Sequence, residues 1–206
     1  MRMGGPGAGQ KGDIRRRARR STAFRRVAAF MLAVLGLLST AQAQRTPPTE
    51  YEVKAAYLYN FGKFVEWPSG EAATKDESFE ICVLGDDPFG AALDSAVTGA
   101  TINGKNVAVK RITKAQEIDG CRILFISSSE SERLPGILGS LDKANVLTVS
   151  DMPQFSQRGG MIQFVLDGKR VRFEVNLTNA QGAGLNLSSE LLKVALRVTR
   201  DSHSGS

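Results

Sequence analysis

Short apolar runs alternate with short helical segments through the middle of the chain, and this alternation restricts the possible fold more than any other feature. We expect strands at residues 79–84, 106–112, 121–126 and 145–149. Between them we expect helices at 89–97 and 131–141 and single helical turns at 113–118 and 151–157. Strands this continuously apolar, alternating with helices, are typical of a parallel sheet that is buried on both faces. The predicted fold is therefore α/β, with a mainly parallel sheet flanked by helices on both faces.

The pattern changes at residue 161. Two strand-like runs, 161–166 and 169–176, are separated by Asp167-Gly168, a residue pair that favours a two-residue type I′ turn. Apolar and polar residues alternate in the second run, so one of its faces is expected to meet water. We therefore predict an antiparallel hairpin at the edge of the sheet. A helix at 188–198 and a flexible tail at 199–206 are expected to follow it.

A helix is predicted to begin the folded part of the chain. Thr49 is a suitable N-cap for a helix from Glu50 to Glu66, which Pro68 would end. One apolar stripe of this helix is assigned to the core: Val53, Ala56, Tyr57, Phe61 and Phe64. A second apolar row runs along another side: Tyr51, Ala55, Leu58 and Val65. We leave open whether the second row is core or subunit contact, and name Tyr51, Leu58 and Val65 as a candidate partner or dimer surface.

The first 43 residues carry all of the chain's excess positive charge. They hold nine of the 27 basic residues and one of the 21 acidic residues, so the formal charge of +6 becomes −2 when they are removed. An apolar stretch at 27–38 is too short to span a bilayer, and Ala41-Gln42-Ala43 is a suitable cleavage site. We predict a signal peptide at 1–43, cleaved between Ala43 and Gln44, and a single domain at 44–198. The predicted mature chain is periplasmic, binds no nucleic acid and does not insert into a membrane.

Cys82 and Cys121 are the only two cysteines, and both lie in predicted strands. An exported chain meets an oxidising compartment, in which an even number of cysteines favours disulfide formation. If the two strands are neighbours, a disulfide would join them. Two separately buried free cysteines are the alternative, and the lack of a C-x-x-C spacing argues against a redox-catalytic pair.

No group of residues in the sequence is arranged for covalent catalysis. The single histidine, His203, lies in the predicted tail, which argues against histidine-assisted nucleophiles and histidine-rich metal sites. Asp86 and Asp87 resemble the acidic corner of phosphoacceptor receiver domains, but the required aspartate and lysine after later strands are missing, so we interpret the pair as a turn. We expect no enzyme activity, no cofactor and no metal. A crevice at the strand ends near Asp86, Ser127 and Asp151 is the candidate small-ligand site.

Several motifs form an ordered set along residues 51–198. They are Tyr57-Leu-Tyr-Asn-Phe61, Phe64-Val-Glu-Trp-Pro68, Ile81-Cys-Val-Leu-Gly-Asp86, residues 121–127 and, near the C-terminus, residues 176–177 and 185–192. In order and spacing this set resembles the YfiR family. The resemblance implies a small periplasmic α/β protein, often dimeric, that represses an inner-membrane diguanylate cyclase by binding its periplasmic sensor domain. Such repression restrains cyclic di-GMP synthesis and biofilm formation.

The resemblance also implies a role for the cysteines. Cys82 and Cys121 match the structural disulfide of the family, here joining two central strands. The best-known member has a second cysteine pair in its later half, and this chain lacks it, so a redox switch that depends on that pair is not expected. A membrane histidine kinase is the alternative partner, and binding of a small periplasmic ligand is the alternative function.

Overall fold

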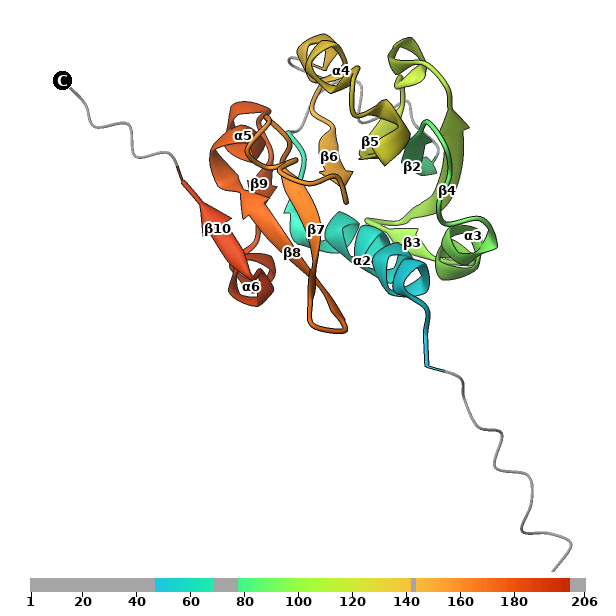
Figure 1. Cartoon of the computed structure of the whole chain (residues 1–206). Coiled ribbons are helices and arrows are strands. Elements are labelled where there is room, and N and C mark those ends of the chain that lie inside the picture. Colours follow the sequence, from blue (N-terminus) through green and yellow to red (C-terminus); the bar gives the residue numbers. More distant parts are fainter. Residues whose placement is uncertain (1–46, 69–77, 142–143, 201–206) are drawn as a thin grey trace, which may run out of the picture. The chain divides into compact units, whose positions relative to one another are not determined.

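The computed structural model describes residues 47–68, 78–141 and 144–200, and the described residues from Pro48 onward form one compact unit (Figure 1). The predicted signal peptide, with its cleavage site between Ala43 and Gln44, lies outside the described residues, as do residues 201–206 of the predicted tail. Within the described part, no helix is long and apolar enough to cross a membrane.

An eight-stranded, mostly parallel sheet forms the centre of the described residues, which confirms the predicted α/β class. Its strands, in their order across the sheet, are β10 (Arg197–Thr199), β8 (Arg170–Asn176), β7 (Ile162–Asp167), β6 (Leu147–Ser150), β5 (Cys121–Ile126), β2 (Ser78–Leu84), β4 (Lys105–Ile112) and β3 (Thr101–Ile102). Neighbouring strands are parallel from β7 across β6, β5 and β2 to β4, whereas β7 with β8 and β3 with β4 are antiparallel. A separate two-stranded sheet pairs β1 (Val65–Glu66) with β9 (Asn186–Leu187).

The sheet is buried on both faces because the side chains of its central strands alternate between two cores. Ile81 and Val83 of β2 lie in one core, and Cys82 and Leu84 lie in the other. Residues of α2 (Glu50–Phe64), α3 (Ala91–Val97), α5 (Leu177–Gly182) and α6 (Ser189–Val194) belong to the first core, and residues of α4 (Leu134–Ser140) belong to the second. Helices therefore flank the sheet on both faces, as predicted.

The C-terminal part differs from the prediction. β7 and β8 form the predicted antiparallel hairpin, but the hairpin is not at the edge of the sheet, because β10 pairs in parallel with β8. The helix predicted at 188–198 ends at Val194, since Ala195 has an extended backbone and the Leu196 N–H donates to the Phe173 carbonyl oxygen at 2.8 Å. This extended segment forms hydrogen bonds with the edge of β8, whose backbone groups a longer helix would leave unpaired. Thr199 consequently belongs to the sheet and not to the predicted tail.

Cys82 and Cys121 form the predicted disulfide, with their Cα atoms 5.8 Å apart. β2 and β5 are neighbouring strands, and both cysteines are buried in the core that contains α4. The Glu80 carboxylate lies near the two sulfur atoms. Because the sulfur atoms are bonded to each other, neither is available as a thiolate metal ligand.

Helix α2 buries parts of both predicted apolar rows, since Phe61 of the predicted core stripe is buried and Val53 and Tyr57 pack against the core. Leu58 and Val65, predicted as part of a partner surface, are buried, so that prediction is wrong for both residues. The reason is that α3 packs against α2, and Val65 pairs with Leu187 in the small sheet. Phe64, predicted for the core, is instead 39% exposed.

The predicted cap of α2 is present as a reciprocal capping box. The Glu52 N–H donates to the Thr49 hydroxyl at 3.3 Å, and the Thr49 N–H donates to the Glu52 carboxylate at 2.6 Å. Because these bonds satisfy free N–H groups at the helix start, Thr49→Ala is expected to lower the free energy of unfolding by about 1 kcal/mol. Urea unfolding followed by circular dichroism measures the change. Thr49→Ser keeps the hydroxyl and should lose much less, and equal losses in the two variants would contradict a capping role.

Candidate functional site

The strand order reverses between β2 and β5, at the place where the sequence predicts a ligand crevice. The chain leaves β2 through α3 to reach β4 on one side, and then returns to β5 and β6 on the other side. In doubly wound sheets, ligands bind outside the carboxyl ends of the strands at such a reversal. Asp86 follows β2 and Ser127 follows β5, and both line a shallow cleft of about 380 Å³. The structure therefore brings two of the three predicted crevice residues together.

Asp151, the third predicted crevice residue, is not part of this cleft. It follows β6, and its carboxylate is held by two side chains of α2. The Lys54 ammonium donates to Asp151 Oδ2 at 2.6 Å, and the Tyr51 hydroxyl donates to the same oxygen at 3.1 Å. Asp151 thus attaches the first helix to the carboxyl end of a central strand.

Lys54 is the centre of this cluster and is only 4% exposed. Its ammonium also forms an ion pair with Glu50 at 2.6 Å and lies 4.4 Å from the centre of the Tyr51 ring. Burial alone would lower the pKa of Lys54, but the hydrogen bonds to Asp151 and Glu50 outweigh it, so the pKa is raised. Burial and the adjacent Asp151 carboxylate raise the pKa of the Tyr51 hydroxyl. Tyr51, named from the sequence as a partner-surface residue, therefore helps to hold a structural ion pair.

Asp87, which also lines the cleft, is part of a turn, as the sequence predicts. Its Oδ1 atom accepts from the Phe89 N–H at 2.8 Å, and its Oδ2 atom accepts from Arg111 Nε at 2.8 Å. Arg111 also donates to Asp94 at 2.6 Å and to the Gly90 carbonyl oxygen at 3.0 Å. The hydrogen bond from Arg111 lowers the pKa of Asp94, and both carboxylates raise the pKa of Arg111. These contacts give Asp87 a structural role in holding the turn.

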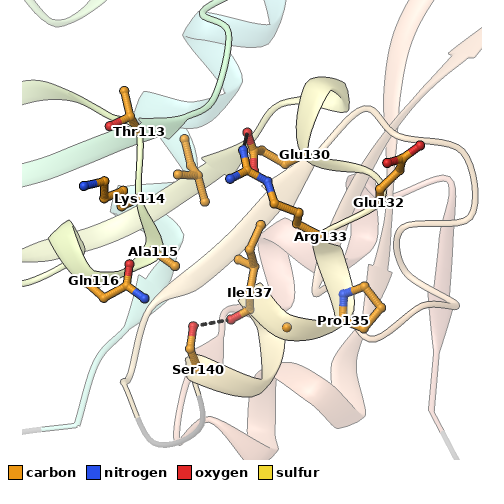
Figure 2. Close-up of a pocket in the computed structure, with 12 residues that line it drawn as sticks. Thr113, Lys114, Ala115, Gln116, Glu130, Glu132, Arg133, Pro135, Ile137 and Ser140 are labelled. Carbon is orange, nitrogen blue, oxygen red and sulfur yellow. Dashed lines mark hydrogen bonds and ion pairs between the residues drawn. The ribbon is translucent and has the colours of Figure 1, made fainter.

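A second pocket, of about 460 Å³, lies beside α4 (Figure 2). Figure 2 shows Lys114 and Gln116 on one side and Glu130 and Arg133 on the other. The Arg133 guanidinium donates to the buried Glu130 carboxylate at 2.6 Å. Because the buried carboxylate is paired within the fold, this charge has a structural explanation and does not by itself require a ligand.

A third hollow is a groove of about 970 Å³ formed by three segments that are distant in the sequence, and we call it the hairpin groove. Its lining comes from the start of α2, the tip of the β7–β8 hairpin and the end of α6. The residues are Pro48, Glu50, Val53, Tyr57, Leu166, Gly168, Lys169, Arg170, Val171, Arg172, Lys193 and Val194. Leu166 and Val194 are 58% and 56% exposed, so the groove combines apolar surface with basic side chains.

Sequence reasoning missed the hairpin groove, although part of it had a signal. Leu166 stands directly before the Asp167-Gly168 turn, and connecting turns lie at the protein surface. Arg170 and Arg172 alternate with the buried Val171 and Phe173 along β8, which indicates that the two arginines lie outside the core. The contributions of α2 and α6 could not be found in the same way, because they meet the hairpin only in the folded chain.

Solved structures match this chain at low sequence identity, as two of them show. One is described as the ABC domain in complex with L-Trp from Streptococcus pneumonia; it is 13% identical, has a TM-score of 0.48, and the match covers 70% of this chain and 60% of that one. The other is a conserved domain protein from Vibrio cholerae; it is 10% identical, has a TM-score of 0.48, and the match covers 75% of this chain and 62% of that one. The chain thus spans about three fifths of the length of each.

A family comparison gives a more extensive match. The family model described as YfiR/HmsC-like matches residues 51–196, which run from the first turn of α2 to the residue before β10. This range includes the disulfide, the cleft at the strand reversal and nearly all of the hairpin groove. Because the match covers well over half of the sequence, the chain belongs to the YfiR/HmsC-like family.

Proposed function

We propose that this protein is a periplasmic regulator that binds the periplasmic domain of a membrane-bound diguanylate cyclase and represses cyclic di-GMP synthesis. The observation that carries the proposal is the family match over residues 51–196, since YfiR-like proteins are periplasmic regulators of diguanylate cyclase signalling. The predicted signal peptide and the Cys82–Cys121 disulfide support export to an oxidising compartment. The protein acts by contact with its partner and not by covalent chemistry.

Repression by contact requires a preference for one state of the partner. A bound protein shifts a two-state equilibrium only by the difference between its affinities for the two states. To move a cyclase from almost fully active to almost fully inactive, the inactive form must be bound about 10⁴-fold more tightly. The regulator therefore needs an interaction surface that fits a single conformation of the partner.

A small-ligand function has weaker support. The three residues of the predicted crevice do not form one site. Asp151 is bound to Lys54 and Tyr51 and does not line the cleft that contains Asp86 and Ser127. The remaining cleft is shallow, and Asp87 within it is already bound by Arg111. The regulatory function has the stronger support, because the family match behind it extends over residues 51–196.

Deleting the gene from its own bacterium is expected to raise cellular cyclic di-GMP, as measured by mass spectrometry of nucleotide extracts. Expression of the full chain should restore the lower level, because the regulator then reaches the periplasm. A chain that lacks residues 1–43 is the matched control and should not restore it. Unchanged cyclic di-GMP in the deletion strain would exclude the proposed role, and an altered histidine-kinase response without that change would favour the alternative partner.

Export is tested separately by intact-mass analysis of the protein from the periplasmic fraction. We expect a chain that begins at Gln44 and carries the disulfide. Recovery of the uncleaved chain from the cytoplasm alone would contradict the predicted localisation.

A further inference from the structure

We propose that the hairpin groove is the docking surface for the partner, and that it takes an acidic segment with apolar side chains from the periplasmic domain of the membrane protein. This inference rests on the proposed function and adds to it the place and the chemistry of the contact. Three observations support it: the exposed apolar side chains, the charge of the lining, and the way in which the hairpin extends from the sheet.

The apolar part of the hairpin groove is unusually exposed for a folded domain. Among the described residues, only four large hydrophobic side chains are more than about a third exposed to solvent, and two of them, Leu166 and Val194, line this groove. Val53 and Tyr57 of α2 add half-buried apolar surface between them. Exposed apolar side chains gathered at one hollow indicate a contact with another molecule more strongly than the same residues scattered singly.

The charge of the lining selects an acidic partner. Lys169, Arg170, Arg172 and Lys193 line the groove, and Glu50 is its single acidic lining residue. The Glu50 carboxylate is already paired with the buried Lys54. The surface is therefore basic, although residues 44–206 together carry a formal charge of −2. A basic site on an otherwise acidic protein steers and orients an acidic segment.

The hairpin reaches beyond the strand that supports it. β6 pairs with β7 only at Ile162 and Gln163, whereas the pairing of β7 with β8 continues to Asp167 and Arg170. Figure 1 shows the hairpin tip extending past the sheet, near the start of α2. Beyond Gln163, β7 has a strand partner on one side only among the described residues. The hairpin tip therefore exposes Leu166 and the basic residues near it to a partner segment. α2 and α6 form the other walls of the groove.

Arginine side chains suit this task in a specific way. A guanidinium forms two parallel hydrogen bonds with one carboxylate, which gives orientation as well as attraction. Apolar anchors near the centre of a contact and charged residues around it are the usual arrangement of protein interfaces. Leu166 and Val194 are the proposed apolar anchors. Lys169, Arg170 and Lys193 are the proposed charged residues around them.

The test measures binding of the mature chain to a purified periplasmic domain. This domain comes from the membrane-bound diguanylate cyclase that is responsible for the rise of cyclic di-GMP in the deletion strain. Isothermal titration calorimetry gives the dissociation constant. Leu166→Asp combined with Val194→Asp is expected to weaken binding by about tenfold or more. Lys169→Glu combined with Arg170→Glu is expected to do the same and to reduce the dependence of affinity on salt.

Matched controls lie outside the hairpin groove. Phe64→Asp changes an exposed apolar residue of α2, and Lys114→Glu changes an exposed basic residue beside α4; neither lines the groove. Both should bind as wild type does. Thermal unfolding of each variant, with a Tm close to that of wild type, shows that a loss of binding is not a loss of fold.

The outcomes separate the inference from the proposed function. If wild type binds and the groove variants bind equally well, the groove is not the docking surface, while the regulatory function stands. If wild type does not bind the cyclase domain, both are overturned. If the groove variants convert a dimer of this chain into a monomer in sedimentation analysis and leave cyclase binding unchanged, a second copy is the occupant, which also overturns the inference.

Discussion

Replacing Cys82 and Cys121 together by alanine is expected to lower the free energy of unfolding by about 4 kcal/mol and the Tm by about 10 °C. The bond joins residues with a sequence separation of 39, and the chain-entropy model gives an effect of about this size for such a loop. Both side chains are buried, so their removal also leaves small voids that add to the loss. Urea unfolding followed by circular dichroism measures the difference.

A reductant provides the matched control for this prediction. Reduced wild type should unfold at nearly the same urea concentration as the double variant, because both lack the covalent loop. The double variant itself should not respond to the reductant. If oxidised wild type and the double variant were equally stable, the disulfide would have no role in stability, and its contribution to the β2–β5 pair would have to be sought in folding kinetics.

Asp151→Ala is expected to be the second most damaging change, with a loss of about 3 kcal/mol in the free energy of unfolding. The reason is the burial of Lys54, whose ammonium loses one of its two carboxylate partners. A buried charge that loses its partner keeps the cost of desolvation without the compensating attraction. The same substitution also removes the acceptor of the Tyr51 hydroxyl. Urea unfolding of the mature chain measures this loss as well.

Glu50→Ala is the control for the ion pair, because it removes the other carboxylate that contacts Lys54. The Glu50 side chain is 40% exposed, so its removal should cost about 1 kcal/mol or less. The double variant Lys54→Met, Asp151→Ala should lose less than the sum of the two single variants, since residues in direct contact are energetically coupled. Equal losses for Glu50→Ala and Asp151→Ala, or simple additivity in the double variant, would contradict the importance of the buried pair.

The raised pKa of Lys54 adds a pH dependence with a definite sign. A group whose pKa is higher in the folded state stabilises the fold fully below its unfolded pKa, here 10.5, and this contribution is lost as the pH rises through the folded pKa. Wild type should therefore lose more stability than Lys54→Met as the pH rises above about 10. The raised pKa of Tyr51 acts in the same direction, so Tyr51→Phe should also weaken the alkaline loss. Parallel curves for wild type and Lys54→Met would contradict this interpretation.

The sequence was most informative where a single local pattern determines the outcome. Apolar runs around Ile81 and Ile123 predicted the buried parallel strands, and the Asp167-Gly168 pair predicted the hairpin turn. The disulfide could be predicted only conditionally, because it depends on β2 and β5 being neighbours. That condition is a property of strand order, which a local pattern does not contain.

The prediction failed where two alternatives share one local pattern. Helix α2 is apolar on two sides, and periodicity alone could not show that Leu58 would be buried while Phe64 would be partly exposed. Lys54 is an equally clear case, since a lysine in an amphipathic helix normally lies in solvent. Its burial depends on Asp151, which is 97 residues away in the sequence. The hairpin groove was missed for the same physical reason, because its walls meet only after folding.

The packing of Phe61 has a consequence for the order of folding. Its ring lies 5.8 Å from the ring of Phe164 and 5.1 Å from the ring of Phe173, measured between ring centres. Contacts between residues so distant in the sequence form slowly, because the intervening chain must be ordered before they stabilise anything. α2 is the first helix of the domain to be synthesised, yet it has no complete docking site until β7 and β8 are available. A nascent chain of this protein therefore stays without its finished core until late in synthesis, so little of the fold has to be undone before the proposed passage across a membrane.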